Sequence, residues 1–303
     1  MRIKNFLFHR VSHDEDRLWP PMQPQHFERI IAHLTRTHQV VLLEDLAGAR
    51  LDSIPAKKPL ATVLFDDGYK DNIEYAAPIL QKYSCPASFY VVTDCINRNQ
   101  PTWTYIIDHA VQHTGRKTLE LPFEYVPEPL KHLELASPGL KSLKPWMKHL
   151  PNARRLEIMD AVVEQCDDVL VPQHLMMNWE EIRQLQRAGF TIGSHSHTHP
   201  LLASLEDEKE IEQELHRSRQ IIEQETGKTP LTISYPIGSF DQRVIRLSEQ
   251  AGYQFGLAVE QVFFRPGKDP LMAIPRVELY QEPWWKTMFR ISGLHQKLRR
   301  IRA

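Results

Sequence analysis

The chain has 303 residues, of which 42% are hydrophobic and 25% are charged, and its formal net charge is −1. These values suit one large α/β domain or two smaller ones, and they exclude a disordered or collagen-like chain. No run approaches the roughly 18 apolar residues that span a bilayer. The apolar run at 6–8 is too short for a secretory signal, and the three scattered cysteines form no zinc-like pair or disulfide framework. We therefore expect a cytoplasmic protein with reduced thiols and no nucleic-acid partner.

Short β-like runs alternate with helical periodicity along the chain. Strands are predicted at 3–8, 61–65, 87–92, 190–193, 231–235, 254–259 and 273–279, and helices at 25–37, 72–83, 179–188 and 241–250. A further helix is expected to begin at a capping box of Ser204 and Asp207 and to end near Gly227. This alternation predicts a largely parallel sheet, open or closed into a barrel, with chemistry at the carboxyl ends of its strands.

The region 94–177 interrupts the alternation. It contains no clean strand pattern, and its helical pieces at 105–112 and 153–165 are separated by the proline-rich segment 121–145. We interpret 94–177 as a helical cap inserted into a single domain that covers residues 1–283.

The predicted strand at 61–65 runs directly into Asp66-Asp67-Gly68. Adjacent carboxylates at a strand end point in different directions and can serve different roles, while the glycine permits a sharp turn. Taken alone, the motif is also typical of a turn whose aspartates cap a helix.

The segment TIGSHSHTHP at 191–200 places His195, His197 and His199 at alternate positions. On a strand all three side chains would share a face, whereas on a helical turn only His195 and His199 align. Because the predicted strand ends at residue 193, the motif favours a turn and a metal site at a strand end.

Three segments carry a family resemblance. LFDDG at 64–68, WEEI at 179–182 leading into GFTIGSHSHTHP at 189–200, and SYPIG at 234–238 occur in this order. They resemble the ordered motifs of the polysaccharide deacetylase family (NodB homology, carbohydrate esterase 4). The resemblance implies an α/β fold, a distorted (β/α)7-type barrel with a helical insertion. It also implies a metal-dependent hydrolase that removes an N-acetyl group from an amino sugar.

The resemblance further implies roles for particular residues. Asp66 would act as the general base beside a divalent metal, with Zn²⁺ as the expected ion. The ligands of that metal would be Asp67, His195 and His199, a set that leaves positions open for water and the acyl oxygen. The backbone N–H of Ile237, in the substrate-binding loop that begins at Tyr235, would hold the oxyanion.

Two features of the family are missing from this sequence. The late Leu-x-His motif that usually supplies the general acid is replaced by IPRVEL at 274–279. The first predicted strand ends at His9, as in members whose acid histidine comes from the N-terminus, so His9 is the candidate acid. Ser234 stands where the family has an arginine. Arg276 is the candidate to restore positive charge beside Asp66, with an ordinary surface ion pair as the alternative.

The last segment, 284–303, contains six basic and no acidic residues and has an amphipathic helical pattern. The pattern suits a helix lying on anionic lipid, and it equally suits a C-terminal helix packed on the barrel. The first interpretation predicts peripheral association with the inner face of the cell membrane. The substrate would then be a lipid-linked amino sugar of a surface polysaccharide or glycolipid pathway.

Other functions stay open at this level. Trp103, in the insertion, is a candidate to stack on a sugar ring, although aromatic side chains more often belong to the core. The same chemistry would serve a deformylase or another linear amide hydrolase. A non-catalytic sugar-binding protein is disfavoured because the base and ligand positions are all filled.

Overall fold

The computed structural model describes residues 2–46 and 57–296. Its centre is an eight-stranded sheet with the order β10-β1-β3-β4-β7-β8-β9, in which β2 pairs with the start of β3. All of these pairings are parallel. The strands are β1 (Lys4–Phe8), β2 (Gln39–Val40), β3 (Leu60–Phe65), β4 (Ser88–Val91), β7 (Thr191–Ser194), β8 (Thr232–Ser234), β9 (Phe255–Leu257) and β10 (Val277–Glu278). Every residue of β3 is buried, as expected for a parallel strand covered on both faces.

The two edges of this sheet approach each other. Leu257 of β9 forms a parallel bridge with Ile274, whose backbone N–H donates to Gly256 at 2.7 Å. The chain then continues into β10, which pairs with β1. The sheet therefore curls into a barrel, and the predicted α/β fold of the distorted (β/α)7 type is confirmed.

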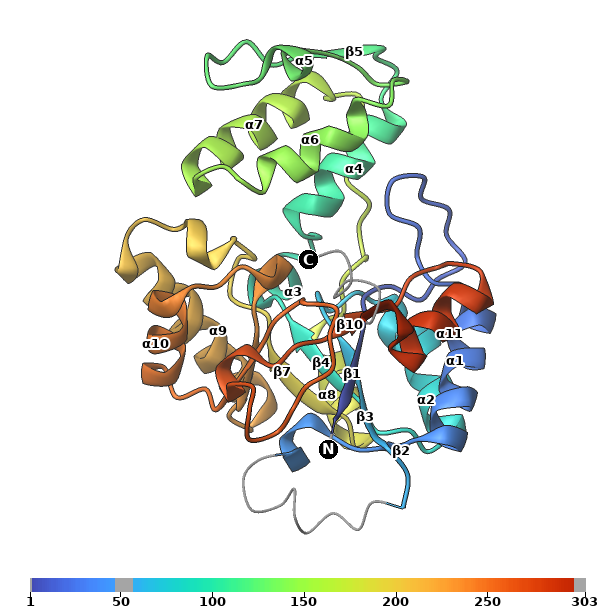
Figure 1. Ribbon diagram of the computed structural model, residues 1–303. Coiled ribbons are helices and arrows are strands. Elements are labelled where there is room, and N and C mark those ends of the chain that lie inside the picture. The colour runs from blue at the N-terminus through green and yellow to red at the C-terminus, as the bar shows by residue number, and fades with distance from the viewer. Residues whose placement is uncertain (1, 47–56, 297–303) are drawn as a thin grey trace.

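Helices cover the outside of the barrel, with α1, α2 and α11 on one side and α9 and α10 on the other (Figure 1). They are α1 (Pro24–Thr37), α2 (Ala77–Lys82), α8 (Trp179–Arg187), α9 (Glu208–Thr226), α10 (Gln242–Gln250) and α11 (Trp284–Ser292). Short helical turns are η1 (Leu43–Leu46), η3 (Asn72–Ala76), η4 (Leu202–Ser204), η5 (Pro236–Gly238) and η6 (Leu271–Ala273). Among the described helices, none is both long and apolar enough to cross a membrane.

Two helix starts differ from the sequence-based expectations. The predicted capping box at Ser204 was wrong. Ser204 belongs to η4, and Asp207 caps α9 by accepting from the Lys209 N–H at 2.9 Å. The predicted end of α9 is confirmed, since Gly227 closes the helix with a φ of 68°. The helix expected at 72–83 opens with the π-helical turn η3. Pro78 lies in the first turn of α2, directly after η3, and it lacks the backbone N–H that an α-helical hydrogen bond would need.

The segment between β4 and α8 stands beyond the carboxyl ends of the strands (Figure 1). Its elements are α3 (Thr93–Arg98), α4 (Trp103–His113), β5 (Thr118–Glu120), α5 (Glu128–Lys131), β6 (His132–Glu134), α6 (Leu140–Met147) and α7 (Asn152–Gln165). Most of its apolar side chains form a cluster of their own. The expectation of a strand-free region was wrong, because β5 and β6 form a small antiparallel pair. At three residues each, these strands are too short for a clear period-2 pattern.

The apolar face of α11 packs on the barrel. Thr287 and Ile291 are buried, and Trp284 and Met288 contact the main core. The guanidinium of Arg29, from α1, lies 4.0 Å from the centre of the Trp284 ring. In the described part of 284–303, the helix thus matches the packed interpretation rather than the lipid-binding one. Residues 297–303, which hold four of the six basic side chains, lie outside the described residues.

Candidate active site

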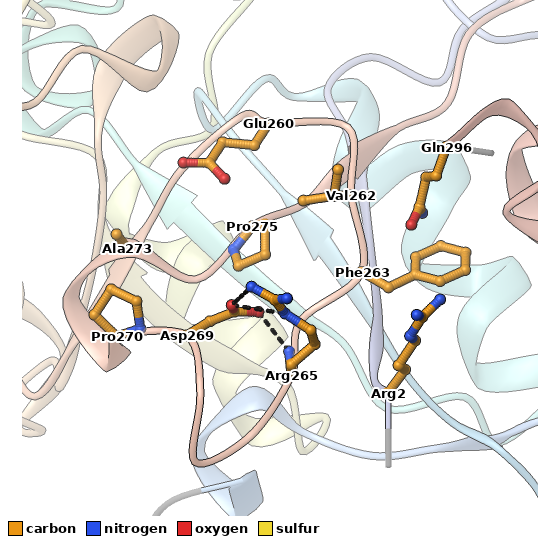
Figure 2. A pocket seen from close by; sticks show the side chains of 10 residues that line it. All are labelled: Arg2, Glu260, Val262, Phe263, Arg265, Asp269, Pro270, Ala273, Pro275 and Gln296. Carbon is orange, nitrogen blue, oxygen red and sulfur yellow. Dashed lines mark hydrogen bonds and ion pairs between the residues drawn. The ribbon is translucent and has the colours of Figure 1, made fainter. Parts of the chain in front are cut away.

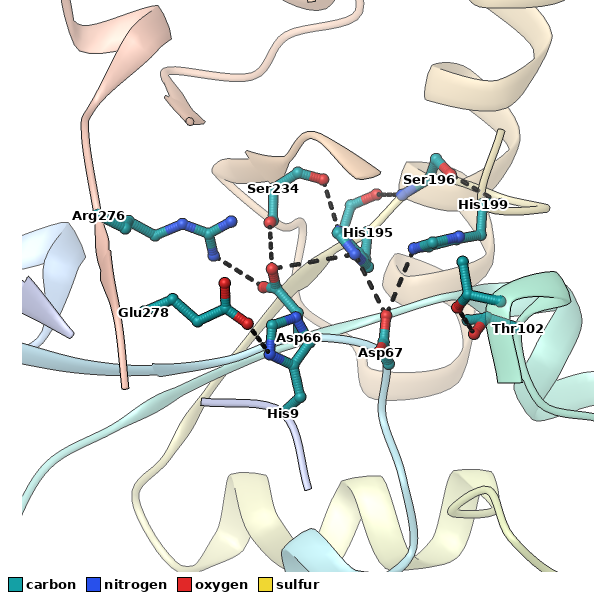
Figure 3. A network of polar contacts seen from close by, with 12 residues as sticks. His9, Asp66, Asp67, Thr102, His195, Ser196, His199, Ser234, Arg276 and Glu278 are labelled. Atoms are coloured by element: carbon teal, nitrogen blue, oxygen red, sulfur yellow. Dashed lines mark hydrogen bonds and ion pairs between the residues drawn. The ribbon is translucent and has the colours of Figure 1, made fainter. Parts of the chain in front are cut away.

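The predicted site residues follow neighbouring strands at one end of the barrel. His9 follows β1, Asp66 and Asp67 follow β3, and His195 follows β7. Because the strands are parallel and in register, their carboxyl ends meet and these side chains converge (Figure 3). They line a cavity of about 260 Å³.

The two aspartates diverge because the backbone turns between them. Asp67 has a φ of 74° and Gly68 a φ of 86°, which is the left-handed region that Asp tolerates and Gly favours. The Gly68 N–H donates to the Asp66 carbonyl at 3.0 Å and closes the turn. The Asp66 side chain therefore points toward Arg276, while Asp67 points toward the histidines (Figure 3).

The histidine motif forms a tight turn, as predicted. Ser196 and His199 have φ values of 66° and 62°, and the His199 N–H donates to the Ser196 hydroxyl at 3.1 Å. Glu214 of α9 holds the outside of the turn, because its carboxylate accepts from the backbone N–H groups of residues 197 and 198, each at 2.8 Å. His197 points away from the site and contacts the Thr93 hydroxyl at 2.8 Å through Nδ1.

Asp67, His195 and His199 bring three donor atoms together. Asp67 Oδ1 lies 3.4 Å from Nε2 of His195 and 3.4 Å from Nε2 of His199. These separations are long for hydrogen bonds. They match the edge of a tetrahedron, about 3.3 Å, whose corners lie 2.0–2.1 Å from a Zn²⁺ ion. The donor set therefore fits a small divalent metal.

The two histidines of the donor set differ in their protonation. Nδ1 of His195 donates to the Ser234 carbonyl at 2.7 Å, which directs Nε2 toward the site. Burial acts to lower the pKa of His195, but Asp66 and Asp67 outweigh burial and raise it, so a metal would displace the proton from Nε2. Burial, assisted by the neighbouring His195, lowers the pKa of His199 to about 3. The His199 ring is therefore neutral at physiological pH and can also act as a ligand.

Asp66 lies beside this donor set and is held by other partners. Its Oδ1 accepts from Arg276 Nη1 at 2.9 Å, and its Oδ2 accepts from the Ser234 hydroxyl at 3.0 Å. Burial acts to raise the pKa of Asp66, but Arg276 and His195 outweigh burial and hold the pKa below its usual value. Asp66 is thus an ionised carboxylate, and each of its oxygens keeps a free lone pair.

Arg276 is a buried ion-pair partner, and the alternative of a surface pair was wrong. Its side chain is fully buried, and Nε also donates to the Ala258 carbonyl at 3.1 Å. It stands next to Ser234 at the base of Asp66, which places positive charge where the family arginine is missing (Figure 3).

His9 lines the same cavity as Asp66 and the metal donors, and its ring lies beside Asp66 and near Asp67 (Figure 3). Its Nδ1 is 3.4 Å from Oε1 of Glu278, and its ring meets Trp19 edge-on at 5.2 Å. Glu278, which the sequence analysis did not single out, in turn accepts from the Tyr280 hydroxyl at 2.6 Å. The histidine ring is thus held at the cavity wall between an aromatic side chain and a carboxylate.

The remaining predicted residues divide into two groups. Ile237 lines the cavity, and its φ of 58° is unusual for a β-branched residue, as in loops that hold a functional geometry. The side chain of Tyr235 instead lies in the core and donates to the Met272 carbonyl at 3.0 Å. Trp103 is buried in the insertion cluster, and its neighbour Thr104 reaches the cavity instead. The side chains of Tyr235 and Trp103, which we expected to contact the substrate, therefore do not line this cavity.

A second cavity, of about 400 Å³, opens beside the loop between β9 and β10 (Figure 2). Arg2 of its wall precedes β1, so this cavity lies at the other end of that strand from His9. Of its four charged residues, Arg265 and Asp269 pair with each other at 2.9 Å, and the other two are Arg2 and Glu260. Within residues 2–46 and 57–296, Asp67, His195 and His199 form the only cluster of metal-type donors. The metal-type donors therefore make the cavity of about 260 Å³ the candidate active site.

Known proteins resemble this chain in sequence and in fold. The sequence matches the family model described as "Polysaccharide deacetylase" over residues 53–137 and 162–256, more than half of the chain. YxkH of Bacillus subtilis, named as a polysaccharide deacetylase, is 26% identical over 81 residues, which are 27% of this chain and 29% of that protein. The chain therefore matches less than a third of the length of this curated relative.

Solved structures show a similar fold. The Streptococcus pyogenes deacetylase PplD in complex with acetate superposes with a TM-score of 0.65 at 13% identity, covering 96% of this chain and 97% of that one. A de-N-acetylase from Aggregatibacter actinomycetemcomitans gives a TM-score of 0.63 at 16% identity, with coverage of 95% and 98%. At these identities the likeness concerns the fold.

Proposed function

Because the chain belongs to the polysaccharide deacetylase family, we propose that it is a metal-dependent hydrolase that removes an N-acetyl group from an amino sugar. Enzymes of this family are hydrolases of carbon–nitrogen bonds other than peptide bonds. The observation that carries the proposal is a buried Asp67-His195-His199 donor set beside the ionised Asp66, in one cavity. We place the substrate in a surface polysaccharide or glycolipid pathway, where such acylated sugars occur.

The residues of the chain divide the chemistry among them. A divalent ion held by Asp67, His195 and His199, with Zn²⁺ as the expected ion, would supply Lewis acidity and a water of lowered pKa. Asp66 accepts the proton of the attacking water, and Arg276 keeps this carboxylate ionised. The Ile237 backbone N–H is the proposed donor to the oxyanion.

His9 is the proposed general acid. It lines the same cavity as Asp66 and the metal donors, so a leaving nitrogen bound in this cavity would come within its reach. Glu278 faces Nδ1 at 3.4 Å, so an imidazolium at this position would direct its Nδ1–H to the carboxylate and transfer its Nε2 proton to the leaving nitrogen. Protonating the amine is necessary because an amide anion is too poor a leaving group.

Product release by the metal-loaded protein tests the proposed function. The purified chain, loaded with Zn²⁺, would be incubated with N-acetylated oligosaccharides, nucleotide-linked sugars and lipid-linked sugars, with formylated sugars alongside. We expect acetate, assayed enzymatically, to appear with at least one N-acetylated sugar and to disappear after chelation. Release of formate alone would reassign the chain as a deformylase. A chain that binds sugars but takes up no divalent ion would be a non-catalytic sugar-binding protein.

The variant His9→Gln separates the acid step from the rest of catalysis. We expect kcat on an N-acetyl sugar to fall by roughly 10²-fold or more, the usual contribution of a general acid. Hydrolysis of para-nitrophenyl acetate should change far less, because its phenolate leaves without protonation. His13→Gln, an exposed neighbour, is the matched control. Equal losses on both substrates would remove His9 from the acid role.

A further inference from the structure

The insertion contributes a positively charged wall to the catalytic cavity. Lys144 of α6 and Lys148, directly after that helix, both line the cavity together with the metal donors. Residues four apart lie on the same side of a helix, so both side chains reach the cavity from one surface. Together with Thr104 of α4, they are the cavity-lining residues that come from the insertion.

The two lysines differ in whether a carboxylate pairs directly with the ammonium group. The ammonium of Lys144 pairs with the buried carboxylate of Asp108. For Lys148, by contrast, no ion pair or side-chain hydrogen bond is formed with any of the described residues. The carboxylate of Glu278, which shares the cavity, faces His9 instead. Glu278 and Asp108 act on Lys148 through space, but each carboxylate has a closer partner, His9 and Lys144 respectively. The Lys148 ammonium therefore faces the cavity without a directly bonded counter-ion.

Burying this ammonium without a directly bonded counter-ion costs free energy. Burial, with the neighbouring charge of Lys144, lowers the pKa of Lys148. The dipole of α6 favours a cation at its carboxyl end, where Lys148 lies, but does not require that side chain to line the cavity. Lys141, near the start of the same helix, is exposed. A half-buried ammonium without a partner is best explained by a ligand that brings the missing negative charge.

We propose that Lys148, with Lys144 beside it, binds an anionic group of the substrate, so that the acylated sugar carries a phosphate or carboxylate oxyanion. This inference rests on the proposed function and specifies its substrate class. An ammonium offers three donors, so Lys144 can keep Asp108 and still donate to the anion. Of the three carboxylates in the cavity, Asp66 is paired with Arg276 and Asp67 lies at the metal donors. The third, Glu278, is paired with His9 at 3.4 Å, which offsets its repulsion of an anion at the lysines.

The test compares an anionic sugar with its neutral parent on the full, Zn²⁺-loaded chain. The probes are N-acetylglucosamine, its anomeric phosphate and an N-acetylated aminouronic acid, with kcat/KM and calorimetric Kd as readouts. We expect a preference for an anionic probe of about 10- to 100-fold, the size of a charge-assisted hydrogen bond. The variant Lys148→Gln should remove most of this preference, whereas the exposed Lys141→Gln should retain it. The phosphate and carboxylate arms show which oxyanion is recognised.

The possible outcomes separate the anion site at the lysines from the proposed hydrolase function. If Lys148→Gln folds by circular dichroism, keeps its metal and retains the full preference, the anion does not bind at the lysines. Neutral sugars hydrolysed as well as anionic ones would likewise overturn the anion site while leaving the hydrolase intact. Lysine-dependent binding of the anionic sugar without acetate release would support the site and contradict the proposed function. Direct binding of phosphate to the metal would appear as a preference that survives in Lys148→Gln.

Discussion

Changing Asp66 to asparagine is expected to lower kcat by roughly 10²- to 10⁴-fold while the protein keeps its metal. The amide has nearly the same shape as the carboxylate, but it cannot accept the proton of the attacking water. Its carbonyl oxygen can still accept from Arg276, which keeps the buried guanidinium partnered. Asp66 is not one of the three clustered metal donors, so the affinity for the metal should change little.

The measurement pairs acetate release with elemental analysis of the same sample. Asp94→Asn is the matched control, because Asp94 also follows a strand at this end of the barrel but does not line the cavity. It should keep wild-type turnover. Full activity in Asp66→Asn would exclude Asp66 as the base, and loss of metal in that variant would make it a ligand instead.

Removing His195 or His199 is expected to weaken metal binding by more than about 100-fold, since even outer partners of metal ligands contribute 10- to 100-fold. Either change to alanine leaves only two donors around the site. Metal content after dialysis, and titration against a competing chelator, measure the loss. Turnover should fall in parallel.

His197→Ala is the internal comparison for this pair. His197 belongs to the same turn but contacts Thr93, so the variant should retain its metal. Loss of this buried hydrogen bond should lower the free energy of unfolding by roughly 1–3 kcal/mol. Denaturant unfolding measures that change. Metal loss in His197→Ala equal to that in His195→Ala would contradict the assignment of the ligands.

The order of strands and helices was largely predictable because it follows from local pattern. The all-buried β3 and the amphipathic α1 and α10 were recognised from the spacing of their apolar residues. Errors arose where the pattern was too short or had two explanations. The strands β5 and β6 pair only with each other, and two cap residues compete just before α9.

Within the site, prediction succeeded where the motif itself set the geometry. The spacing of His195 and His199, together with a turn rather than a strand, determined that they would face the same donor. Residues that act through long-range contacts were missed. Glu214, which holds the histidine turn, and Glu278, which faces His9, belong to segments without a recognisable motif.

The alternation of strands and helices, and the ligand-type side chains at strand ends, can be read from the amino-acid order because both depend on residues close together in the chain. Which side chains share the cavity depends instead on how distant segments pack. Arg276 reaches Asp66 across the barrel, whereas the side chains of Tyr235 and Trp103 turn into the core. The unpaired Lys148 arrives from the insertion. Such contacts depend on strand order, on the curl of the sheet and on the packing of the insertion, and no local pattern encodes these.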